Sequence, residues 1–499
     1  MLKFIFLNTY KKLAGDTAIY GMSSIIGRFL NWWLVPYYSR LFLPETYGIV
    51  TNLYSYVAFL LVLLTYGMET GFFRFASRSE DPKKVYSTSM FSLFFTTLVF
   101  ILVIVFFKDW IAEKINYAGH SRYILWLSLV VAIDAFTAIP FAKLRIENRP
   151  MRFASIKLAN IGFNIGFNLF FLTLCPYLLK QNPDSFISVI YSPRIGVGYV
   201  FISNLLASGA TFILLLPELL KFSFVFDAKL LLKLLNYSFP ILIVGLAGMI
   251  NQNIDKILLP FLTPEAKDPM YQVGIYGANY KLAVLMNMFI QAFRYAFEPF
   301  FFSRGTAKDD KEVHAVIMNY FIIFGLIIFL GIMLYIDIVK HVIDARYYEG
   351  LKVVPIVLFA NLFLGIYFAL SLWYKLVDKT RFGAYIAMVG AVITIVLNVV
   401  LIPVIGYMGS AIAVFVCFFV MVVISYFLGQ KYYPIPYDLK SISQYFGVAL
   451  LIYFTSHLIH NFTPYLKYGL NTFLFMIFLF FIYLKEKNRI ERLLNFRKR

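Results

Sequence analysis

The chain has 499 residues, of which 61% are hydrophobic and only 14% are charged. Soluble domains carry about 25% charged residues, so this composition excludes a soluble protein with a large core and indicates a polytopic membrane protein. The net charge of +19 is spread over short segments between apolar stretches. Because the cations form no basic patch interleaved with aromatic residues, we expect no nucleic-acid partner.

Apolar segments of about 20 residues, the length that crosses a bilayer, recur along the whole chain. They predict an all-α polytopic membrane protein with about fourteen transmembrane helices. The predicted spans are 14–36, 47–68, 86–107, 122–142, 155–178, 196–219, 238–262, 273–300, 314–336, 353–374, 383–403, 407–428, 441–459 and 468–484.

The Lys and Arg residues between these spans fall mostly on one side of the membrane if the N-terminus is cytoplasmic. By the positive-inside rule, both termini are then predicted to be cytoplasmic. The loops on the outer side are short, and the longest, 179–195, cannot hold a catalytic domain. We therefore expect a membrane transporter rather than an enzyme, with no catalytic residues.

Two pairs of similar segments indicate an internal repeat. "LPETYGIVTNLYSY" and "YQVGIYGANYKL" both place Tyr-Gly (Tyr47-Gly48 and Tyr276-Gly277) at the outer end of a span, and "GFNLFFLTLCP" resembles "VLNVVLIPVIG". Six spans separate each pair, which favours two six-helix lobes in parallel repeat plus a C-terminal helix pair, with the transport site between the lobes. The predicted divisions are a cytoplasmic tail (1–12), an N-lobe (13–222), a C-lobe (230–430), a final helix pair (440–484) and a basic cytoplasmic tail (485–499).

Arg28 lies in the middle of an otherwise apolar stretch, 17–35. A charge at that depth costs about 2.5–3.5 kcal/mol on insertion scales, so it marks a functional site by default. Ser24 and Asn31 share its helix face, and no acid lies within one helical turn. We therefore expect Arg28, Ser24 and Asn31 to line the path of an anionic substrate.

Three further cations lie inside predicted spans: Lys256, Lys281 and Arg294. With Asn251, they are candidate substrate-binding residues. Arg294 has an alternative role, because Glu298 is four residues away and the two can neutralise each other.

Three acids are candidates for coupling transport to an ion: Asp134, Asp255 and Glu69. Asp134 either binds a coupling ion or forms a structural ion pair with Arg28, and both interpretations remain open at this stage. Lys281 has Asp255 and Glu69 as alternative partners.

A polar stripe in the fifth span, formed by Lys157, Asn160, Asn164 and Asn168, either lines a cavity or makes hydrogen bonds between helices. No phosphate-binding loop or zinc motif occurs. His457 and His460 are three residues apart without a visible third ligand, and both cysteines lie in apolar segments. The sequence therefore predicts no metal site and no cofactor.

Three segments carry a family resemblance: "YGMSSIIGRFLNWWLVPYYSRLFLPETYGIVTNLYSYVAFLLVLLTYGMETGFFRF", "PFAKLRIENRPMRFA" and "LNVVLIPVIGYMGSAIA". They resemble the polysaccharide transport family, which includes the Wzx-type O-antigen and capsule repeat-unit flippases, of the multidrug/oligosaccharidyl-lipid/polysaccharide exporter superfamily. The resemblance implies two six-helix, MATE-like lobes around a central cavity that opens alternately to each side of a bacterial inner membrane. It also implies that cavity cations attract the pyrophosphate of a lipid-linked substrate, with Arg28 matching the family's usual arginine. In related lipid II flippases the extra helix pair is thought to offer a groove for the lipid tail.

The resemblance thus implies a flippase that moves undecaprenyl-pyrophosphate-linked oligosaccharides outward for O-antigen (lipopolysaccharide), capsule or exopolysaccharide synthesis. The alternatives are a lipid II flippase and a multidrug exporter of the same superfamily. The implied partners are the lipid-linked oligosaccharide, membrane lipids and a polysaccharide polymerase or chain-length machinery.

Overall fold

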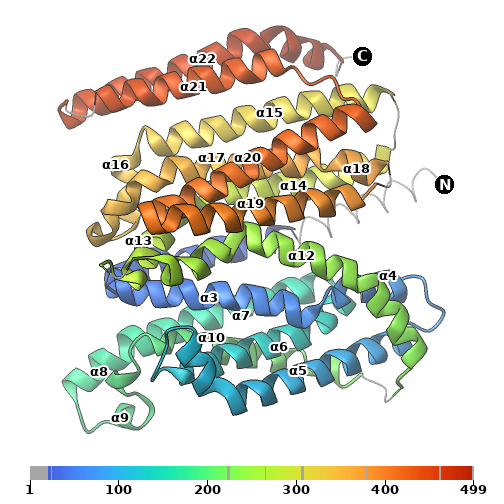
Figure 1. Cartoon of the computed structure of the whole chain (residues 1–499), viewed down its shortest axis with the longest axis vertical. Helices are drawn as coiled ribbons and strands as arrows, with labels where there is room; N and C mark the ends of the chain where they lie inside the picture. The colour runs from blue at the N-terminus through green and yellow to red at the C-terminus, as the bar shows by residue number, and fades with distance from the viewer. Residues whose placement is uncertain are drawn as a thin grey trace. The chain divides into compact units, whose positions relative to one another are not determined.

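The computed structural model describes residues 21–23, 25–221, 225–264, 266–304, 308–377, 379–459 and 462–496, with the backbone alone for 296–304, 308–310 and 488–496. In this part of the chain every regular element is a helix (Figure 1). The predicted all-α fold class is therefore confirmed. Contacts divide the chain into two compact units: Met1–Gly277 with Thr394–Gly406, and Ala278–Ile393 with Tyr407–Arg499.

The first unit holds the elements up to α12 and the start of α13. Their bounds are α2 (Leu34–Leu41), α3 (Pro44–Thr65), α4 (Met68–Ala76), α5 (Pro82–Lys114), α6 (Ser121–Ile146), α7 (Pro150–Leu169), η1 (Phe170–Leu174), α8 (Cys175–Gln181), α9 (Ile187–Ile190), η2 (Pro193–Ile195), α10 (Gly198–Leu214), α11 (Leu216–Leu219), α12 (Ala228–Leu262) and α13 (Pro269–Tyr280). Within this unit α5 packs on α6, α7 packs on α10, and α12 packs on α3 and α4.

The second unit holds most of the remaining elements. Their bounds are η3 (Lys281–Ala283), α14 (Val284–Arg304), α15 (Lys308–Met333), α16 (Ile336–Val339), η4 (Lys340–Val342), η5 (Ala345–Val353), α17 (Val354–Leu370), α18 (Leu372–Leu376), α19 (Arg381–Ile405), α20 (Tyr407–Tyr432), α21 (Leu439–Leu458) and α22 (Pro464–Phe496). Here α17 packs on α20 and α15, and α21 runs beside both α15 and α22 (Figure 1).

Ten helical stretches among the described residues are long and apolar enough to cross a membrane. Four predicted spans are not among the ten. The first, 14–36, lies largely outside the described residues; 196–219 contains α10, which has only 17 residues; 273–300 is divided by η3; and 441–459 corresponds to α21. The chain is therefore a multi-pass membrane protein, while the count of fourteen stays a prediction.

The second predicted span ends where the backbone enters the left-handed region. Tyr66 has φ of +36° and Gly67 has φ of +72°, a conformation that glycine adopts without steric cost. A Cβ at Gly67 would also press on the carbonyl oxygen of Ser238 in α12. Glycine at this position therefore allows both the turn from α3 into α4 and the close approach of α12.

The same side-chain hydrogen bond occurs in both of the similar segments "GFNLFFLTLCP" and "VLNVVLIPVIG". The side-chain amide of Asn168 donates to the carbonyl of Asn164 over 2.8 Å, and that of Asn398 donates to the carbonyl of Thr394 over 2.7 Å. Both asparagines are fully buried. This shared geometry is consistent with the predicted repeat, and the lobe boundaries stay a prediction.

The segment between α10 and α12 is held by buried and exposed ion pairs. The carboxylate of Glu218, 1% exposed, lies 2.7 Å from Arg152 Nε and 3.3 Å from Arg149 Nη1, and the hydroxyl of Tyr86 donates to its backbone carbonyl over 3.0 Å. Removing one partner of a buried ion pair is strongly destabilising. These contacts therefore hold α11, at the start of the segment that joins α10 to α12, against the α6–α7 turn and α5.

At the other end of this connection, Asp227 caps α12 by accepting a hydrogen bond from Leu230 N over 3.0 Å. Its carboxylate also lies 2.7 Å from Lys84 Nζ in α5. The hydrogen bond from Lys84 lowers the pKa of Asp227 to about 2. The carboxylate thus stays ionised at physiological pH and ties the first turn of α12 to α5.

Polar contacts join α22 to α15 and α21 within the second unit. Glu486, 2% exposed, accepts hydrogen bonds from Asn319 Nδ2 over 2.9 Å and from the hydroxyl of Tyr445 over 2.6 Å. Nearer the start of α22, Asn471 Nδ2 donates to the carbonyl of Leu334 over 2.7 Å. The C-terminal pair is therefore an integral part of the second unit.

Asp337 in α16 gives a test of this attachment, because it pairs with Lys467 of α22 and lies 2.7 Å from Lys340 Nζ. Partial burial raises the pKa of Asp337, but hydrogen bonds from Lys340 and Lys467 outweigh burial and lower it to about 2. A depressed pKa stabilises the fold above the unfolded-state value of about 3.9 and loses this effect as pH falls through 2. We expect Asp337→Asn to lower the melting temperature of the detergent-solubilised protein at pH 6 and to weaken its decline between pH 4 and 2.

The control for this measurement is Asp184→Asn, at an exposed position in the loop after α8. It should leave the pH profile of the melting temperature unchanged. Equal profiles for Asp337→Asn and wild type would contradict an anchoring role for Asp337.

Candidate transport pathway

Arg28 lies on a helical stretch, residues 25–32, and its side chain is exposed, as is that of Asn31. Ser24, the third residue predicted for this face, lies outside the described residues. Exposure of a cation within a predicted span is informative, because charged groups in such spans face water or protein rather than lipid. The assignment of Arg28 to an aqueous path therefore stays a prediction.

Lys281 is also exposed, and it opens η3, a single 3₁₀ turn between α13 and α14. A 3₁₀ stretch inside a longer helix is often a hinge or a strained segment. Arg294 in α14 is half-buried, with its guanidinium carbon 4.1 Å from the ring centroid of Phe368. The side chain of Glu298, its alternative partner, lies outside the described residues.

Lys256 is the most buried of the candidate cations whose exposure the structure gives, and it is paired with its neighbour in the sequence. Its Nζ lies 2.9 and 3.1 Å from the two carboxylate oxygens of Asp255, the preceding residue of α12. Lys256 is 7% exposed and Asp255 is fully buried. The hydroxyl of Tyr276 in α13 donates a further hydrogen bond to Asp255 Oδ2 over 2.7 Å. In this conformation the charge of Lys256 is therefore neutralised.

A second hydrogen-bonded chain reaches the same turn of α12. Asn52 Nδ2 in α3 donates to the backbone carbonyl of Lys256 over 2.7 Å, and the hydroxyl of Tyr117 donates to Asn52 Oδ1 over 2.8 Å. Asn52 and Tyr117 are buried, as is Asn251 one turn earlier in α12. These bonds join α3, α12 and the α5–α6 connection at the end that the topology prediction places outside.

α3 and α13 cross so closely that their backbones touch. A Cβ added to Gly48 would overlap the carbonyl oxygen of Met270, and one added to Gly274 would overlap the carbonyl oxygen of Pro44. Each glycine thus lies against the carbonyl four residues before the other glycine. Small residues permit this kind of close crossing inside membranes.

The glycine that contacts Gly48 is not the one that the sequence repeat pairs with it. The repeat aligned Tyr47-Gly48 with Tyr276-Gly277. The reciprocal partner of Gly48 is Gly274, one helical turn earlier, while Gly277 lies against the side chain of Thr51. Sequence comparison selected the identical dipeptide, whereas helix packing depends on which small residue faces the neighbouring backbone.

Asp134 lies in a polar cluster formed by α3, α6 and α10. Its Oδ1 accepts a hydrogen bond from the hydroxyl of Ser208 over 2.8 Å, and close by Asn204 Nδ2 donates to the hydroxyl of Tyr54 over 2.9 Å. Lys157 in α7 also interacts electrostatically with Asp134. The choice between an ion-coupling role for Asp134 and a structural pair with Arg28 therefore stays a prediction.

Lys157 in α7 belongs to the polar stripe that the sequence predicts either to line a cavity or to make hydrogen bonds between helices. It is exposed, its Nζ lies 4.0 Å from the ring centroid of Phe141, and it interacts electrostatically with Asp134 and Glu69. Glu69 itself pairs with Arg145. The two acids offered as partners for Lys281 are thus engaged by other cations, Asp255 by Lys256 and Glu69 by Arg145.

Two asparagines of the same stripe make hydrogen bonds between helices. Asn160 Nδ2 donates to the hydroxyl of Thr211 in α10 over 2.8 Å, and Asn168 Oδ1 accepts from the hydroxyl of Tyr38 in α2 over 2.7 Å. For these two residues the structural interpretation of the stripe is confirmed.

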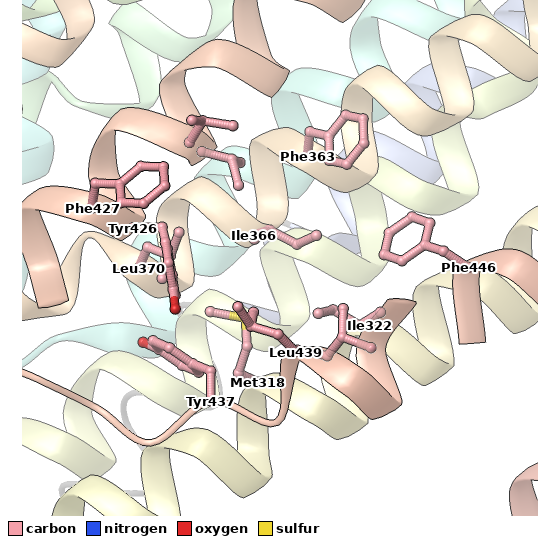
Figure 2. Close-up of a pocket in the computed structure, with 13 residues that line it drawn as sticks. Met318, Ile322, Phe363, Ile366, Leu370, Tyr426, Phe427, Tyr437, Leu439 and Phe446 are labelled. Atoms are coloured by element: carbon pink, nitrogen blue, oxygen red, sulfur yellow. The ribbon is translucent and has the colours of Figure 1, made fainter. Parts of the chain in front are cut away.

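An apolar pocket of about 200 Å³ lies between α15, α17, α20 and α21, within the second unit. Figure 2 shows Ile366, Phe363 and Phe446 along it and the hydroxyls of Tyr426 and Tyr437 turned toward each other. Among the lining residues, Phe427 and Leu439 are strongly exposed. The pocket therefore reaches the apolar surface of the protein.

The sequence did not identify the polar residues that reach the Asp255–Lys256 turn of α12 from other helices and loops. Asn52 and Tyr117 are single polar residues on apolar elements, and only the fold brings them to Lys256. Gly274 carried a detectable signal, since it and Gly277 are three residues apart on one helix face. That spacing is typical of close helix packing.

A family model described as "Polysaccharide biosynthesis protein" matches residues 13–305. None of the curated protein sequences matches the chain. Solved structures do match, and because their sequence identities are low, these similarities establish the fold alone.

One similar structure is that of the lipid II flippase MurJ in an inward closed conformation, with 14% identity, a TM-score of 0.70, and coverage of 94% of this chain and 99% of that chain. An inward-facing multidrug resistance MATE family transporter of the MOP superfamily has 12% identity, a TM-score of 0.64, and coverage of 86% and 96%. A MOP superfamily transporter from Pyrococcus furiosus, described as having a binding pocket of reverse polarity, has 12% identity, a TM-score of 0.55, and coverage of 83% and 95%.

The α3–α13 crossing leads to a prediction about stability. We expect Gly48→Ala and Gly274→Ala each to destabilise the protein by about 1–3 kcal/mol, because the added methyl group overlaps backbone that cannot rotate away. The melting temperature of the detergent-solubilised protein measures the effect.

Gly248→Ala in α12 is the matched control, because nothing lies within 4 Å of its Cβ position. Alanine there should be neutral or stabilising by up to about 1 kcal/mol. If all three variants melt alike, the close crossing of α3 and α13 is not part of the folded state in solution.

Proposed function

The chain belongs to the polysaccharide biosynthesis protein family, and from this premise we propose that it is a flippase for undecaprenyl-pyrophosphate-linked oligosaccharides. It moves these repeat units from the inner to the outer leaflet of a bacterial inner membrane by alternating access. The products serve O-antigen, capsule or exopolysaccharide synthesis. Both termini are cytoplasmic in this proposal, and a polysaccharide polymerase or chain-length machinery receives the exported units.

The exposure of Arg28 within a predicted membrane span carries the proposal. An arginine offers five donors in a planar fork, and it binds phosphate oxygens with paired, charge-assisted hydrogen bonds. Lys157, an exposed cation of the same unit, adds further positive charge there. A site of this kind suits a pyrophosphate head group and disfavours a cationic drug.

The apolar pocket of the second unit supports the lipid part of the proposed substrate. Its volume of about 200 Å³ is below the 300–1,000 Å³ of pockets that enclose drug-sized ligands, so it would hold only a segment of a long chain. The exposed rim formed by Phe427 and Leu439 would let the rest of a polyprenyl tail continue into the bilayer.

The membrane potential favours the proposed direction. Each negative charge that leaves a cell with a negative interior gains about 2.3 kcal/mol per 100 mV. Cations along the path offset the cost of taking the pyrophosphate out of water. Export could therefore proceed on the potential, with or without exchange of another ion at Asp134, Asp255 or Glu69.

The structural similarity to MurJ keeps a lipid II flippase as the second candidate, since lipid II carries the same kind of lipid-linked pyrophosphate. A multidrug exporter is less consistent with exposed cations, because a positive surface repels cationic drugs.

Complementation of a deletion strain tests the head-group role of Arg28. We expect the deletion to accumulate a lipid-linked oligosaccharide on the cytoplasmic leaflet, and Arg28→Ala to lower the flipping rate at least about tenfold, because it removes a charge-assisted hydrogen-bonding group. Arg28→Lys should restore part of the rate, since it keeps the charge without the fork. The accumulated lipid-linked glycan is the quantity to measure.

Arg194→Ala, which removes an exposed arginine from η2, is the matched control and should complement fully. Full rescue by Arg28→Ala would show that this cation does not bind the head group. Accumulation of lipid II in the deletion strain would replace the repeat-unit assignment by the peptidoglycan one.

The pocket gives a separate prediction. Ile366→Trp should fill it and weaken binding of undecaprenyl pyrophosphate by roughly tenfold, because excluding two CH₂ groups costs about 1.6 kcal/mol. Binding to the purified protein in detergent can be measured by native mass spectrometry. Val404→Trp, at a position that is 74% exposed in α19, should leave the affinity unchanged; equal affinities for the two variants would place the tail elsewhere.

A further inference from the structure

The buried pair of Asp255 and Lys256 lies where three helices meet at the predicted outer end. α3 reaches it through the hydrogen bond from Asn52 to the carbonyl of Lys256, and α13 reaches it through the hydroxyl of Tyr276. Lys256 Nζ also lies 5.3 Å from the ring centroid of Tyr276. A change in the pairing of Asp255 with Lys256 therefore alters the contacts that hold α3, α12 and α13 together.

Asp255 is fully occupied in this arrangement. Its Oδ1 accepts from Lys256 Nζ and Oδ2 accepts from Tyr276. In a low-dielectric environment a carboxylate and an ammonium group stabilise each other only while they stay together, and removing one partner leaves an uncompensated charge. The contact among the three helices thus depends on Lys256 remaining with Asp255.

The close crossing of α3 and α13 at Gly48 and Gly274 makes the contact among the three helices respond cooperatively to the Asp255–Lys256 pair. Because Gly48 and Gly274 lie against backbone carbonyls, α3 and α13 are in contact over their main chains at the same end of the molecule. A close-packed crossing of this kind is either formed or broken and has little room for intermediate distances. The ion pair and the crossing therefore form one two-state contact.

We infer that Lys256 is a second anion-binding site that is paired with Asp255 in the absence of substrate. The anionic head group competes with Asp255 for this lysine. This inference rests on the proposed function and names the residue that regulates its site. When a pyrophosphate takes Lys256, the carboxylate loses its counter-charge, the contact of α12 and α13 with α3 loses stability, and the two helices separate at the outer end. Asp255 is thus a positioning residue that makes opening dependent on the substrate.

Distance measurements between spin labels test this coupling in the full-length protein in liposomes. Labels on Leu43→Cys, just before α3, and Lys267→Cys, just before α13, lie at exposed positions. The native Cys175 and Cys417 are buried, so labelling falls on the introduced thiols. The probe is undecaprenyl pyrophosphate in the vesicles, with inorganic pyrophosphate as a second, lipid-free anion.

We expect wild type to show a short distance that gains a longer component when undecaprenyl pyrophosphate is present. Asp255→Asn should show the longer component without any anion, with an open-to-closed ratio raised at least about 100-fold, because the ammonium of Lys256 loses its partner. The double variant Asp255→Asn with Lys256→Gln removes both charges. It should return to the short distance and no longer respond to either anion.

The matched control is Asp109→Asn, which breaks an adjacent Lys–Asp pair, Lys108 with Asp109 (2.8 Å), at an exposed position. It should leave the distance distribution as in wild type. A short distance in Asp255→Asn, or a double variant that still opens with the anion, would overturn the inference.

Failure of the inference and failure of the proposed function give different results. If Asp255→Asn stays closed while the deletion strain still accumulates a lipid-linked oligosaccharide, the inference is wrong and the proposed function stands. If Asp255→Asn opens but neither anion opens wild type, the pair is a structural latch only, and the competition by an anionic head group is refuted.

Discussion

A charge within a membrane span must be paired, hydrated or bound to a substrate, since hydrocarbon offers none of these. Lys256 shows the first of these solutions, because it is buried and paired with Asp255. Arg28 and Lys281 are exposed. The difference in exposure separates a cation enclosed by packed helices from cations at the protein surface.

The paired cation in turn depends on close packing. The Coulomb interaction of an ion pair is stronger in a buried site than in water, and Asp255 and Lys256 are both buried. The two helices that bond to this turn of α12, α3 and α13, approach each other to backbone contact at Gly48 and Gly274. The packing also depends on the pair, because Asp255 and Lys256 anchor hydrogen bonds from α13 and α3. Electrostatics and packing thus stabilise the same conformation, and a ligand that weakens one weakens both.

Hydropathy was enough to predict the all-α membrane fold, because the length and composition of single helices determine it. The repeat was predicted from sequence similarity, and its lobe boundaries and the role of Arg28 stay predictions. The partner of Lys256 was not predictable. Adjacent residues on a helix do not normally face each other, so sequence spacing gave no signal for the pairing of Lys256 with Asp255 or for the hydrogen bonds from Tyr276 and Asn52 that meet there. Likewise η3, which opens at Lys281, interrupts a continuous apolar stretch and leaves no mark in the hydropathy pattern.

The arrangement also bears on how a transporter of anions avoids trapping its substrate. A path with every cation exposed would bind a pyrophosphate too firmly to release it, whereas a path with none would not admit it. In the proposed mechanism, Asp255 neutralises Lys256 until the head group arrives, and the positive charge is thereby divided into a part that attracts the anion and a part that responds to it. Because a ligand shifts a two-state equilibrium only through its different affinity for the two states, a lysine that is available in one state alone is an effective means of coupling binding to opening.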